Sequence, residues 1–329
     1  MNRKKAGMIA AAAAFPAAVM AGGVAFFFNY SVVRMKKKKK KKKKVPELKA
    51  GQGLTFDCFR DKIDEGIAWF KEQQPEKITL TSYDGLKLSA YLLPAETESK
   101  NVLLLMHGYR ADGYTDFSGL FKFYHDQGYH LLVPHQRSHA DSEGKYICFG
   151  VKERFDCKMW AEYAVRRFGK DCNLYLSGIS MGSSTVLMAV GLGLPENVRG
   201  IIADCGFTSP YDIFRHVMQL QFKLPLFPLM NLTEAVNRKK AGFGYKDVST
   251  LDILKKCSIP ILFIHGGKDE FVPTQMTLDN YSACAGPKEL LIVPEAGHGT
   301  SNFVEPGRYR ETALRFMEKY SNCSAGRRI

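Results

Sequence analysis

A serine between two glycines stands where an apolar run of the chain meets a helix-like stretch. The pattern is Gly-Ile-Ser-Met-Gly at residues 178–182, and it follows the apolar residues 174–176. A strand that turns this sharply into a helix presses backbone against backbone, so the flanking positions need glycine and the serine is strained. The turn pushes the hydroxyl into the open, which is the geometry of a nucleophile elbow. The chain is therefore predicted to place a strand directly before Ser180 and a helix directly after it.

Strand and helix patterns alternate along the chain from residue 77 onward. Two strand patterns flank the turn residues Asp84 and Gly85 and predict a hairpin. Later strand patterns are apolar runs separated by helical periodicity. The expected strands are residues 77–83, 87–94, 102–106, 129–134, 173–177, 198–204, 259–265 and 289–294, and the expected helices include residues 117–127, 154–168, 183–192 and 308–320. This order predicts the α/β class, with a mostly parallel eight-stranded sheet covered by helices on both faces.

The chain is long enough for one large domain, and its charge is unevenly distributed. It has 329 residues, of which 45% are apolar, and a formal net charge of +14. Residues 1–44 hold thirteen basic residues and no acid, so the rest of the chain carries a net charge of only +1. A balanced domain offers no basic face, and the charge therefore argues against nucleic acid as a partner.

Eight cysteines are scattered along the chain without any C-x-x-C pair. An even number permits disulfides, but a chain of this length does not need them, and scattered thiols are typical of a reducing compartment. We therefore expect free thiols. The sequence shows no ligand cluster with the spacing of a zinc site, and we expect neither a metal nor a cofactor.

The N-terminal segment lacks charge over 28 residues, from residue 6 to residue 33. About 20 apolar residues suffice to cross a bilayer as a helix. We therefore predict a transmembrane helix and assign residues 1–34 to a membrane anchor. A cleaved secretory signal is the alternative, because residues 3–5 are basic and residues 19–21 fit a cleavage site. The apolar run continues well past that site, which favours the uncleaved anchor.

Basic residues follow the apolar segment, with Arg34 and then nine lysines at residues 36–44. By the positive-inside rule this block keeps the following domain in the cytoplasm, as part of a single-pass protein of the cell membrane. An extracellular domain is the other outcome, since the N-terminal flank is basic too. The lysines are also expected to form a solvated spacer along anionic headgroups. We assign residues 35–55 to a basic linker.

About fifty residues separate Phe207 from the strand that begins at Ile259, whereas a simple crossover needs about a dozen or more. Residues 213–222 form one apolar helical face, and further apolar residues follow between prolines. Two interpretations are open. The segment is either an ordinary crossover helix with a long loop or a small helical cap at about residues 208–250 that covers the site.

A serine hydroxyl is a weak nucleophile and needs a base that is itself oriented by a carboxylate. Asp269 follows the strand that ends at His265, and His298 lies in a Gly-His-Gly sequence after the last strand. The carboxyl ends of parallel strands meet at one edge of a sheet, so Ser180, Asp269 and His298 are expected to converge there. These three residues are the predicted catalytic triad.

The triad assignments have rivals elsewhere in the sequence. Asp269 competes with its neighbour Glu270 and with Asp204, which also ends a strand. Cys205 is expected to be a small core residue and not a second nucleophile. Three other histidines at strand ends are expected only to brace the turns that follow them, namely His107, His135 and His265. The position after the last strand favours His298 over these three.

The oxyanion of an acyl-transfer intermediate needs backbone amides that point at it. The apolar residues 103–106 run into His107 and Gly108, and the loop after this third strand is where a backbone N–H faces a nucleophile elbow. Gly108 permits a close approach of the backbone. We therefore expect the amides of Tyr109 and Met181 to form an oxyanion hole.

Taken in order, these motifs resemble those of the α/β-hydrolase-fold serine hydrolases. They are the His-Gly turn at residues 107–108, the Gly-Ile-Ser-Met-Gly elbow, His-Gly-Gly-Lys-Asp-Glu-Phe-Val-Pro at residues 265–273 and Gly-His-Gly at residues 297–299. The chain is similar to the bacterial group that contains serine-aminopeptidase-like and lysophospholipase-like enzymes. The resemblance implies a hydrolase domain at residues 56–323, with a cap insertion at about residues 208–250.

One segment departs from the pattern of these relatives. They often carry Asp-x-Arg-Gly-His-Gly-x-Ser-x-Gly after the fourth strand, whereas residues 135–144 read His-Gln-Arg-Ser-His-Ala-Asp-Ser-Glu-Gly. The first acid and two of the glycines are replaced. The departure leaves the triad intact and bears on the shape of the pocket.

The triad predicts acyl transfer to water through an acyl-enzyme. An apolar cap and a membrane segment favour a carboxylic ester of an acyl or lipid-like substrate over a sugar. An aminopeptidase or acyl-peptide hydrolase is a second candidate and needs a cap acid to hold the substrate amine, yet Glu234 is the only acid between Ile213 and Lys246. A non-catalytic binding protein and a cofactor-free perhydrolase on the same fold are further alternatives. The oligomeric state stays open.

Overall fold

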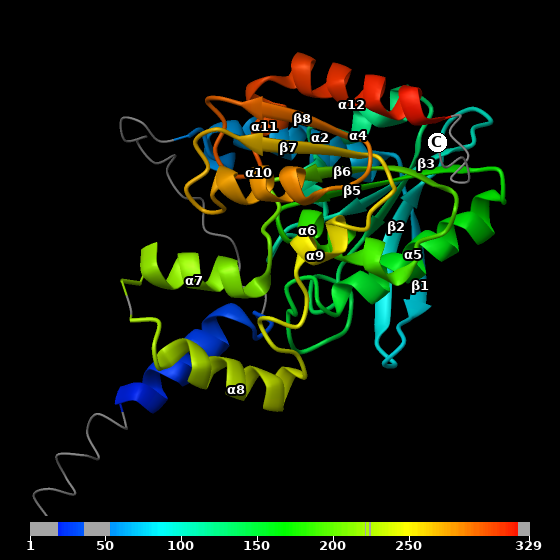
Figure 1. The fold of residues 1–329 in the computed structure, drawn as a ribbon. Helices are drawn as coiled ribbons and strands as arrows, with labels where there is room; N and C mark the ends of the chain where they lie inside the picture. Colours follow the sequence, from blue (N-terminus) through cyan, green and yellow to red (C-terminus); the bar gives the residue numbers. More distant parts are fainter. Residues whose placement is uncertain (1–18, 36–52, 221, 224, 322–329) are drawn as a thin grey trace, which may run out of the picture.

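Eight strands form one sheet in the computed structural model, which describes residues 19–35, 53–220, 222–223 and 225–321 (Figure 1). The strands are β1 (Glu76–Thr81), β2 (Lys87–Leu93), β3 (Asn101–Met106), β4 (His130–Pro134), β5 (Asn173–Ile179), β6 (Val198–Asp204), β7 (Ile261–Gly266) and β8 (Lys288–Val293). Their order across the sheet is β1-β2-β4-β3-β5-β6-β7-β8. β2 pairs antiparallel with β1 and β4, and the other neighbours pair parallel. The predicted eight-stranded, mostly parallel sheet is thus confirmed.

Helices cover both faces of this sheet. They are α2 (Arg60–Glu72), α3 (Tyr114–Phe117), α4 (Phe121–Asp126), α5 (Glu153–Phe168), α6 (Met181–Ala189), α7 (Pro210–Leu220), α8 (Leu229–Ala241), α9 (Thr250–Leu254), α10 (Thr274–Ala283), α11 (Ser301–Val304) and α12 (Pro306–Ser321), with short 3-10 helices η1 (Phe56–Phe59) and η2 (Val190–Leu192). Successive residues of a strand point to opposite faces. On β3, Leu104 accordingly belongs to the core with α5 and α6, and Leu103 to the core with α4 and α12.

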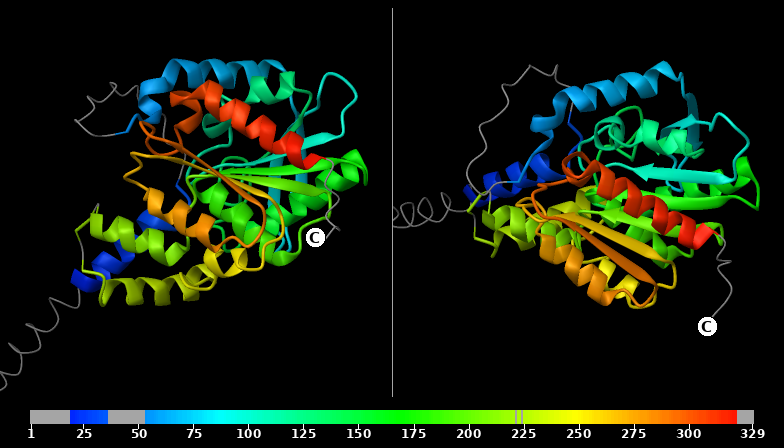
Figure 2. Two further views of the ribbon diagram at one scale, coloured as in Figure 1. Left: turned by 45° about the horizontal axis from the view of Figure 1, so that its top comes forward. Right: turned by 90° about the horizontal axis from the view of Figure 1, so that it is seen from above.

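The insertion between β6 and β7 holds α7 and α8, which lie beyond the edge of the sheet (Figure 1). A helix of residues 19–31, called the N-terminal helix below, lies beside them. Figure 2 shows the same neighbourhood from two further directions. Phe27 and Phe28 of the N-terminal helix share a third apolar core with Phe214 of α7 and Leu229 of α8. Segments almost two hundred residues apart in sequence therefore form one layer.

The predicted membrane anchor and linker lie partly outside the described residues, which leave out residues 1–18 and 36–52. The remainder of the predicted apolar span is the N-terminal helix, whose Val24, Phe27 and Phe28 are buried against the protein. Within the described part of the chain, no helix combines the length and the apolar character needed to cross a membrane. The structure thus gives the transmembrane prediction no support. The C-terminal half of the predicted span packs against the protein instead, since an apolar face packs equally well on lipid or on protein.

Two local features differ from the sequence prediction. The helix predicted at residues 117–127 is divided into α3 and α4, and α2 was not predicted at all. Gly119 lies at the division, where a Cβ atom would approach the Asn302 side chain. Helix α2 is amphipathic and buries Ile63 and Phe70, seven residues apart. The seven cysteines among the described residues are free, in line with the prediction of free thiols, and Cys323 lies outside them.

Candidate active site

Ser180 lies at the turn between β5 and α6, where the Gly-x-Ser-x-Gly pattern places it. Its backbone has φ 57° and ψ −117°, a conformation that residues other than glycine rarely adopt. A Cβ atom on Gly178 would overlap the backbone of Gly182, and one on Gly182 would overlap the Met106 carbonyl. The Ser180 N–H donates to the carbonyl of Asp204 on β6 at 2.8 Å. Close packing and this hydrogen bond therefore hold the strained serine in place.

Three side chains from distant parts of the chain meet above this turn. The Oγ of Ser180 lies 2.8 Å from Nε2 of His298, and Nδ1 of the same imidazole lies 2.7 Å from Oδ2 of Asp269. Ser180 is 6% exposed and the His298 side chain 23%, so the serine is reached mainly through the pocket. We call these three residues the relay. A hydroxyl in this position can pass its proton to an imidazole whose other nitrogen faces a carboxylate.

The carboxylate of Asp269 is held from several sides. Its Oδ1 accepts hydrogen bonds from the amides of Phe271 and Val272, each at 2.9 Å. Nε2 of the buried His265 lies 3.0 Å from Oδ2. Burial raises the pKa of Asp269, but the charge of His298 and the hydrogen bonds of both histidines lower it more, so the pKa lies below its ordinary value. Asp269 is therefore ionised at neutral pH, and His265 braces it, as was expected of that histidine.

The carboxylate of Asp269 has the opposite effect on the pKa of His298, which it raises. Burial lowers the pKa of His298, but the charge and hydrogen bond of Asp269 raise it more, with further contributions from Asp116 and Asp204. The net pKa lies above the ordinary value of histidine. The ring is therefore a stronger base than a free imidazole, as proton abstraction from a hydroxyl requires.

The two acids that compete with Asp269 in the sequence are not the carboxylate partners of His298. Glu270 is exposed in the loop after β7. Asp204 is fully buried at the end of β6, and burial raises its pKa to about 6. The imidazole nitrogen that either acid would have to contact is already bonded to Asp269.

The loop after β3 approaches Ser180 closely enough to supply an oxyanion amide. A Cβ atom on Gly108 would lie 3.3 Å from Cβ of Ser180. The N–H of Gly108 donates to the buried Asp116 at 2.6 Å, which fixes the loop and makes the amide of Tyr109 the next one along. The amide of Met181 begins α6 directly after Ser180. Both amides predicted for the oxyanion hole thus lie on backbone that flanks the serine.

The same loop is bonded to the N-terminal helix. The hydroxyl of Tyr109 donates to the carbonyl of Ser31 at 2.8 Å, and the guanidinium of Arg110 donates to the carbonyl of Tyr30. Carbonyls at a helix C-terminus lack intrahelical partners, so these two donors cap the helix. Arg34 then donates to two carbonyls of the loop after β4, at 2.6 and 2.7 Å. These four hydrogen bonds join the N-terminal segment to the loops after β3 and β4.

A narrow pocket opens at Ser180 and is lined almost wholly by apolar side chains. Its lining residues are Phe27, Tyr30, Ser31, Tyr109, Phe149, Ser180, Met181, Phe207, Ile213, Phe214, Val217, Phe271 and Val272. The N-terminal helix and α7 form one side of it, which we call the apolar wall: Phe27, Tyr30, Ile213, Phe214 and Val217. Rings hold the wall together, since the Phe27 and Phe214 centroids are 5.7 Å apart and those of Phe149 and Phe214 are 4.4 Å apart.

Sequence reasoning did not find the part that the N-terminal helix plays in this pocket. Phe27 and Tyr30 belong to the segment that the sequence assigned to the bilayer. An uncharged, aromatic-rich helix fits lipid and an apolar pocket equally well. No signal in the sequence separates the two uses, because the contact partners on α7 lie far along the chain.

The segment that departs from the family pattern lies next to this helix. Arg137, which occupies the arginine position of that pattern, is buried and pairs with Asp156 at 2.6 Å and Asp84 at 2.8 Å. Arg34 of the N-terminal segment binds the following turn. The replaced residues therefore shape a loop that receives the N-terminal segment.

One group of side chains near the relay has the donor types of a metal site. Ligand atoms of Cys205, Asp269 and His298 lie within 4.8 Å of one another. A thiol must be deprotonated to bind a metal, but burial raises the pKa of Cys205 well above its ordinary value. Both nitrogens of His298 are already engaged by Ser180 and Asp269. The geometry therefore favours proton transfer over metal binding.

An eight-stranded sheet of this order, with a strained serine at the turn after β5, defines an α/β-hydrolase-fold serine hydrolase. A sequence model of the prolyl oligopeptidase family matches residues 115–324, which is more than half of the chain. The chain belongs to this family. The resemblance inferred from the motifs is thereby confirmed.

The chain is also similar to individual proteins, at 18–24% identity in the three cases that follow. The uncharacterized protein YqkD of Bacillus subtilis is 24% identical over 269 residues, which cover 81% of this chain and 88% of YqkD. The structure of the Pyrococcus furiosus esterase Pf2001 superimposes with a TM-score of 0.61 at 20% identity, covering 77% of this chain and 95% of the esterase. The Pyrococcus horikoshii acylaminoacyl peptidase superimposes with a TM-score of 0.57 at 18% identity, covering 76% of this chain and 42% of the peptidase. The similar structures thus include both an esterase and a peptidase.

Proposed function

We propose that this protein hydrolyses carboxylic esters of apolar acyl groups, with Ser180 as the nucleophile. His298 removes the proton of the Ser180 hydroxyl as its oxygen attacks the ester carbonyl, and Asp269 holds the imidazole and stabilises its charge. The protonated ring then gives its proton to the departing alcohol, which leaves an acyl-enzyme. Water repeats the sequence on the acyl-enzyme and releases the acid. The observation that carries this proposal is the continuous hydrogen-bonded series from Ser180 Oγ to Asp269.

The negative charge of the tetrahedral intermediate needs donors on the side of Ser180 that faces the loop after β3. The amides of Tyr109 and Met181 are the two proposed donors. Loss of one such donor typically reduces kcat by about 10²–10³-fold. The hydrogen bond from Gly108 to Asp116 keeps this loop in position before substrate arrives.

The lining of the pocket supports an apolar acyl group as the part of the substrate that is bound. Apart from a few hydroxyls, the side chains around Ser180 are aliphatic or aromatic. Burial of each methylene of an acyl chain there contributes about 0.8 kcal/mol. The narrowness of the pocket and the ring contacts of its wall favour a slender acyl chain over a branched or polar group.

A peptide substrate is the second candidate, because the family and one of the similar structures are peptidases. An aminopeptidase needs an acidic side chain that faces the substrate amine. Glu234, the acid nearest in sequence to this role, instead pairs with Arg238 at 3.2 Å and accepts the Tyr245 amide at 3.1 Å. It is also absent from the residues that line the pocket. The site therefore favours an ester over a peptide with a free amino terminus.

We further propose that the N-terminal segment attaches the protein to the cell membrane, with the hydrolase domain in the cytoplasm. The support comes from the sequence, where residues 6–18, before the N-terminal helix, carry no charge and nine lysines follow at residues 36–44. Protease treatment of intact cells tests the side. Digestion of the hydrolase domain from outside would place it on the opposite face.

The catalytic proposal is tested with a fluorophosphonate probe and a series of p-nitrophenyl esters. We expect Ser180→Ala to abolish labelling and to reduce ester hydrolysis by about 10⁴-fold or more. Ser183→Ala is the matched control, because it removes a buried hydroxyl one turn further along α6 and is expected to keep the label. Peptide p-nitroanilides assayed in parallel decide between ester and amide. Labelling that persists in Ser180→Ala, or faster cleavage of the anilides, would refute this assignment.

A further inference from the structure

Large apolar side chains that remain exposed gather at one end of the molecule. Nine such side chains are exposed among the described residues, and seven of them lie on the N-terminal segment, at the end of α7, in the α7–α8 connection and on α8. We call five of these the cap-end surface: Phe26, Tyr30, Leu220, Phe227 and Leu232. Phe227 is 79% exposed and Phe26 54%. The other two exposed side chains, Tyr83 and Leu290, lie elsewhere in the fold.

The segments that bear the cap-end surface are in contact with one another. The ring of Phe222, in the α7–α8 connection, lies 5.9 Å from that of Phe26 and 5.3 Å from that of Tyr30. Gly23 of the N-terminal helix faces Leu229 at the start of α8. Figures 1 and 2 show these elements at the same end of the molecule, beyond the sheet edge. The exposed side chains therefore form one region and not a scatter of single residues, and a contiguous apolar region marks an interaction surface.

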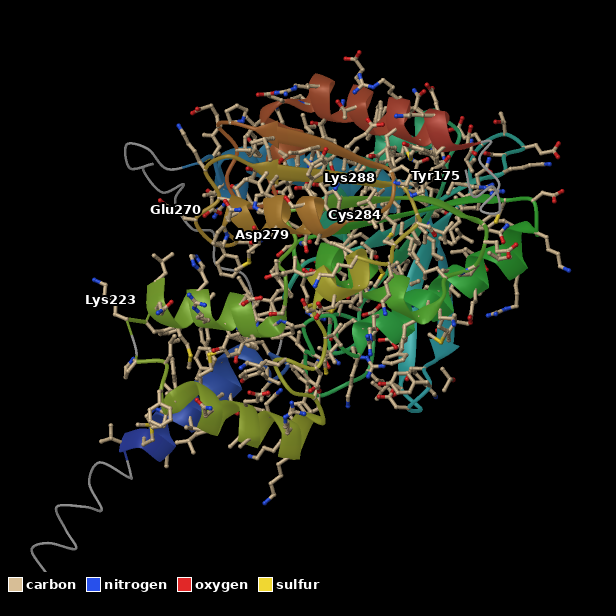
Figure 3. All side chains as sticks on the ribbon, in the orientation of Figure 1. Tyr175, Lys223, Glu270, Asp279, Cys284 and Lys288 are labelled. Carbon is tan, nitrogen blue, oxygen red and sulfur yellow. The ribbon has the colours of Figure 1, made fainter. Side chains whose placement is uncertain are left out.

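Charge around this region selects the kind of partner. Exposed cations lie on the same elements as the apolar side chains, namely Arg215 of α7, Lys223 of the α7–α8 connection, and Lys239 and Lys240 of α8. Lys223 of the α7–α8 connection projects away from the body of the protein (Figure 3). The acids of residues 208–250 are already engaged, since Glu234 and Asp247 pair with Arg238 and Asp212 accepts hydrogen bonds from the hydroxyls of Thr208 and Ser209. Exposed apolar and cationic side chains on the same elements fit the acyl and headgroup layers of an anionic bilayer.

The chain on either side of the described N-terminal segment points to the same partner. The described part begins at residue 19 and breaks off after Met35, which is 53% exposed. The sequence before it lacks charge from residue 6 to residue 18, and the sequence after it has nine lysines. Each lysine near an anionic membrane surface contributes about 1 kcal/mol of attraction. A protein partner would require a complementary acidic rim, whereas anionic lipid provides both layers at once.

From these observations we infer that the cap-end surface lies in the headgroup layer of an anionic phospholipid bilayer. The cap thus makes a membrane contact of its own, separate from any attachment through residues 1–18. This inference builds on the proposed ester hydrolysis, because Tyr30 belongs both to the cap-end surface and to the lining of the pocket. An acyl ester dissolved in the membrane then reaches Ser180 without crossing water.

The test places a tryptophan in the surface of the full-length chain by the substitution Phe227→Trp. The protein is reconstituted in vesicles of phosphatidylcholine and phosphatidylserine with brominated acyl chains, which quench indole fluorescence on contact. We expect the emission added by this substitution to fall about twofold or more, because interfacial side chains lie about 5–10 Å into the boundary of headgroups and acyl chains. Tyr83→Trp and Leu290→Trp are the matched controls, at positions that are 59% and 38% exposed. Their added emission is expected to stay unchanged.

Equal emission changes at positions 227 and 83 would overturn the inference, whether the surface is then free or covered by a second copy of the chain. Equal quenching in vesicles of phosphatidylcholine alone would overturn the requirement for anionic lipid. Hydrolysis of a soluble short-chain p-nitrophenyl ester, measured on the same samples, separates this inference from the proposed function. Quenching without hydrolysis would remove the catalytic proposal and leave the surface, and hydrolysis without quenching would do the reverse.

Discussion

The relay and the apolar wall meet at the same serine but are built in different ways. The relay consists of polar groups at fixed hydrogen-bond distances, between 2.7 and 2.8 Å, on turns and loops that follow β5, β7 and β8. The apolar wall consists of aliphatic and aromatic side chains from the N-terminal helix and α7, which lie beyond the edge of the sheet. Hydrogen bonds depend steeply on distance and angle, whereas apolar contacts depend mainly on the area that is buried. The relay therefore needs a rigid scaffold, whereas exchange of a wall residue leaves the alignment of the reacting groups in place.

This difference predicts which changes affect the chemistry and which affect the choice of substrate. A substitution in the relay is expected to lower the rate on all substrates alike. A substitution in the wall is expected to change the ratio of rates between substrates, because it alters an area and not an alignment. The three predictions that follow test this division, from the largest expected effect to the smallest.

Asp269→Asn is expected to reduce kcat by about 10⁴-fold on every ester, because the amide no longer holds the imidazole in the tautomer that accepts the Ser180 proton. The measurement is steady-state kinetics on a short-chain and a long-chain p-nitrophenyl ester. Asp204→Asn is the matched control, since Asp204 is also buried and has a pKa raised to about 6. We expect Asp204→Asn to reduce kcat by less than about tenfold. Equal reductions of kcat in the two variants would contradict the assignment of the orienting role to Asp269.

The pH profile of kcat/KM reports the protonation of His298 in the free enzyme. The base must be neutral, and Asp269 raises the net pKa of His298 above 6.5 although burial acts against it. Activity is therefore expected to fall as the pH drops through a value above 6.5, by about tenfold per pH unit below it. In Asp269→Asn the carboxylate charge is gone, so this limb should move to lower pH. A limb that stays in place in the variant would contradict the attribution to Asp269.

Phe27→Ala is expected to shift the preferred acyl chain to greater length, with about a three- to tenfold change in the ratio of kcat/KM between long and short esters. The side chain is 1% exposed and its removal enlarges the pocket. Phe121→Ala is the control, because Phe121 is equally buried but belongs to the core with α4 and α12 and does not line the pocket. Both variants are expected to lose about 3–5 kcal/mol of stability, and only the first to change the ratio. An unchanged ratio in Phe27→Ala would remove the N-terminal helix from substrate selection.

The sequence predicted the sheet and the elements around Ser180 because those signals are local. An apolar run followed by Gly-x-Ser-x-Gly has few conformations available, and the order of strands and helices leaves few topologies. Asp269 and His298 were predicted from the same logic, as residues that follow strands of a parallel sheet, and the structure brings both to Ser180. The bracing of Asp269 by His265 was also within reach, since both residues flank one strand end.

The position of the N-terminal helix could not be predicted from the sequence. The 28 uncharged residues at positions 6–33, which include this helix, fit a bilayer, and the sequence prediction stopped at that interpretation. The structure places Phe27 and Tyr30 at the pocket, against a helix that begins at Pro210. Apolar contacts are not directional, so the pattern of one segment does not reveal which distant surface will bury it.

The sequence by itself determined where the strands run, where the serine turn lies and which polar residues follow the strand ends. Those features depend on backbone sterics and on periodicity over a few residues. Only the tertiary structure decided that an N-terminal helix and an insertion helix close the same pocket. That outcome depends on apolar contacts between segments far apart in the chain, and such contacts are selected by the packing of the whole molecule and not by local pattern.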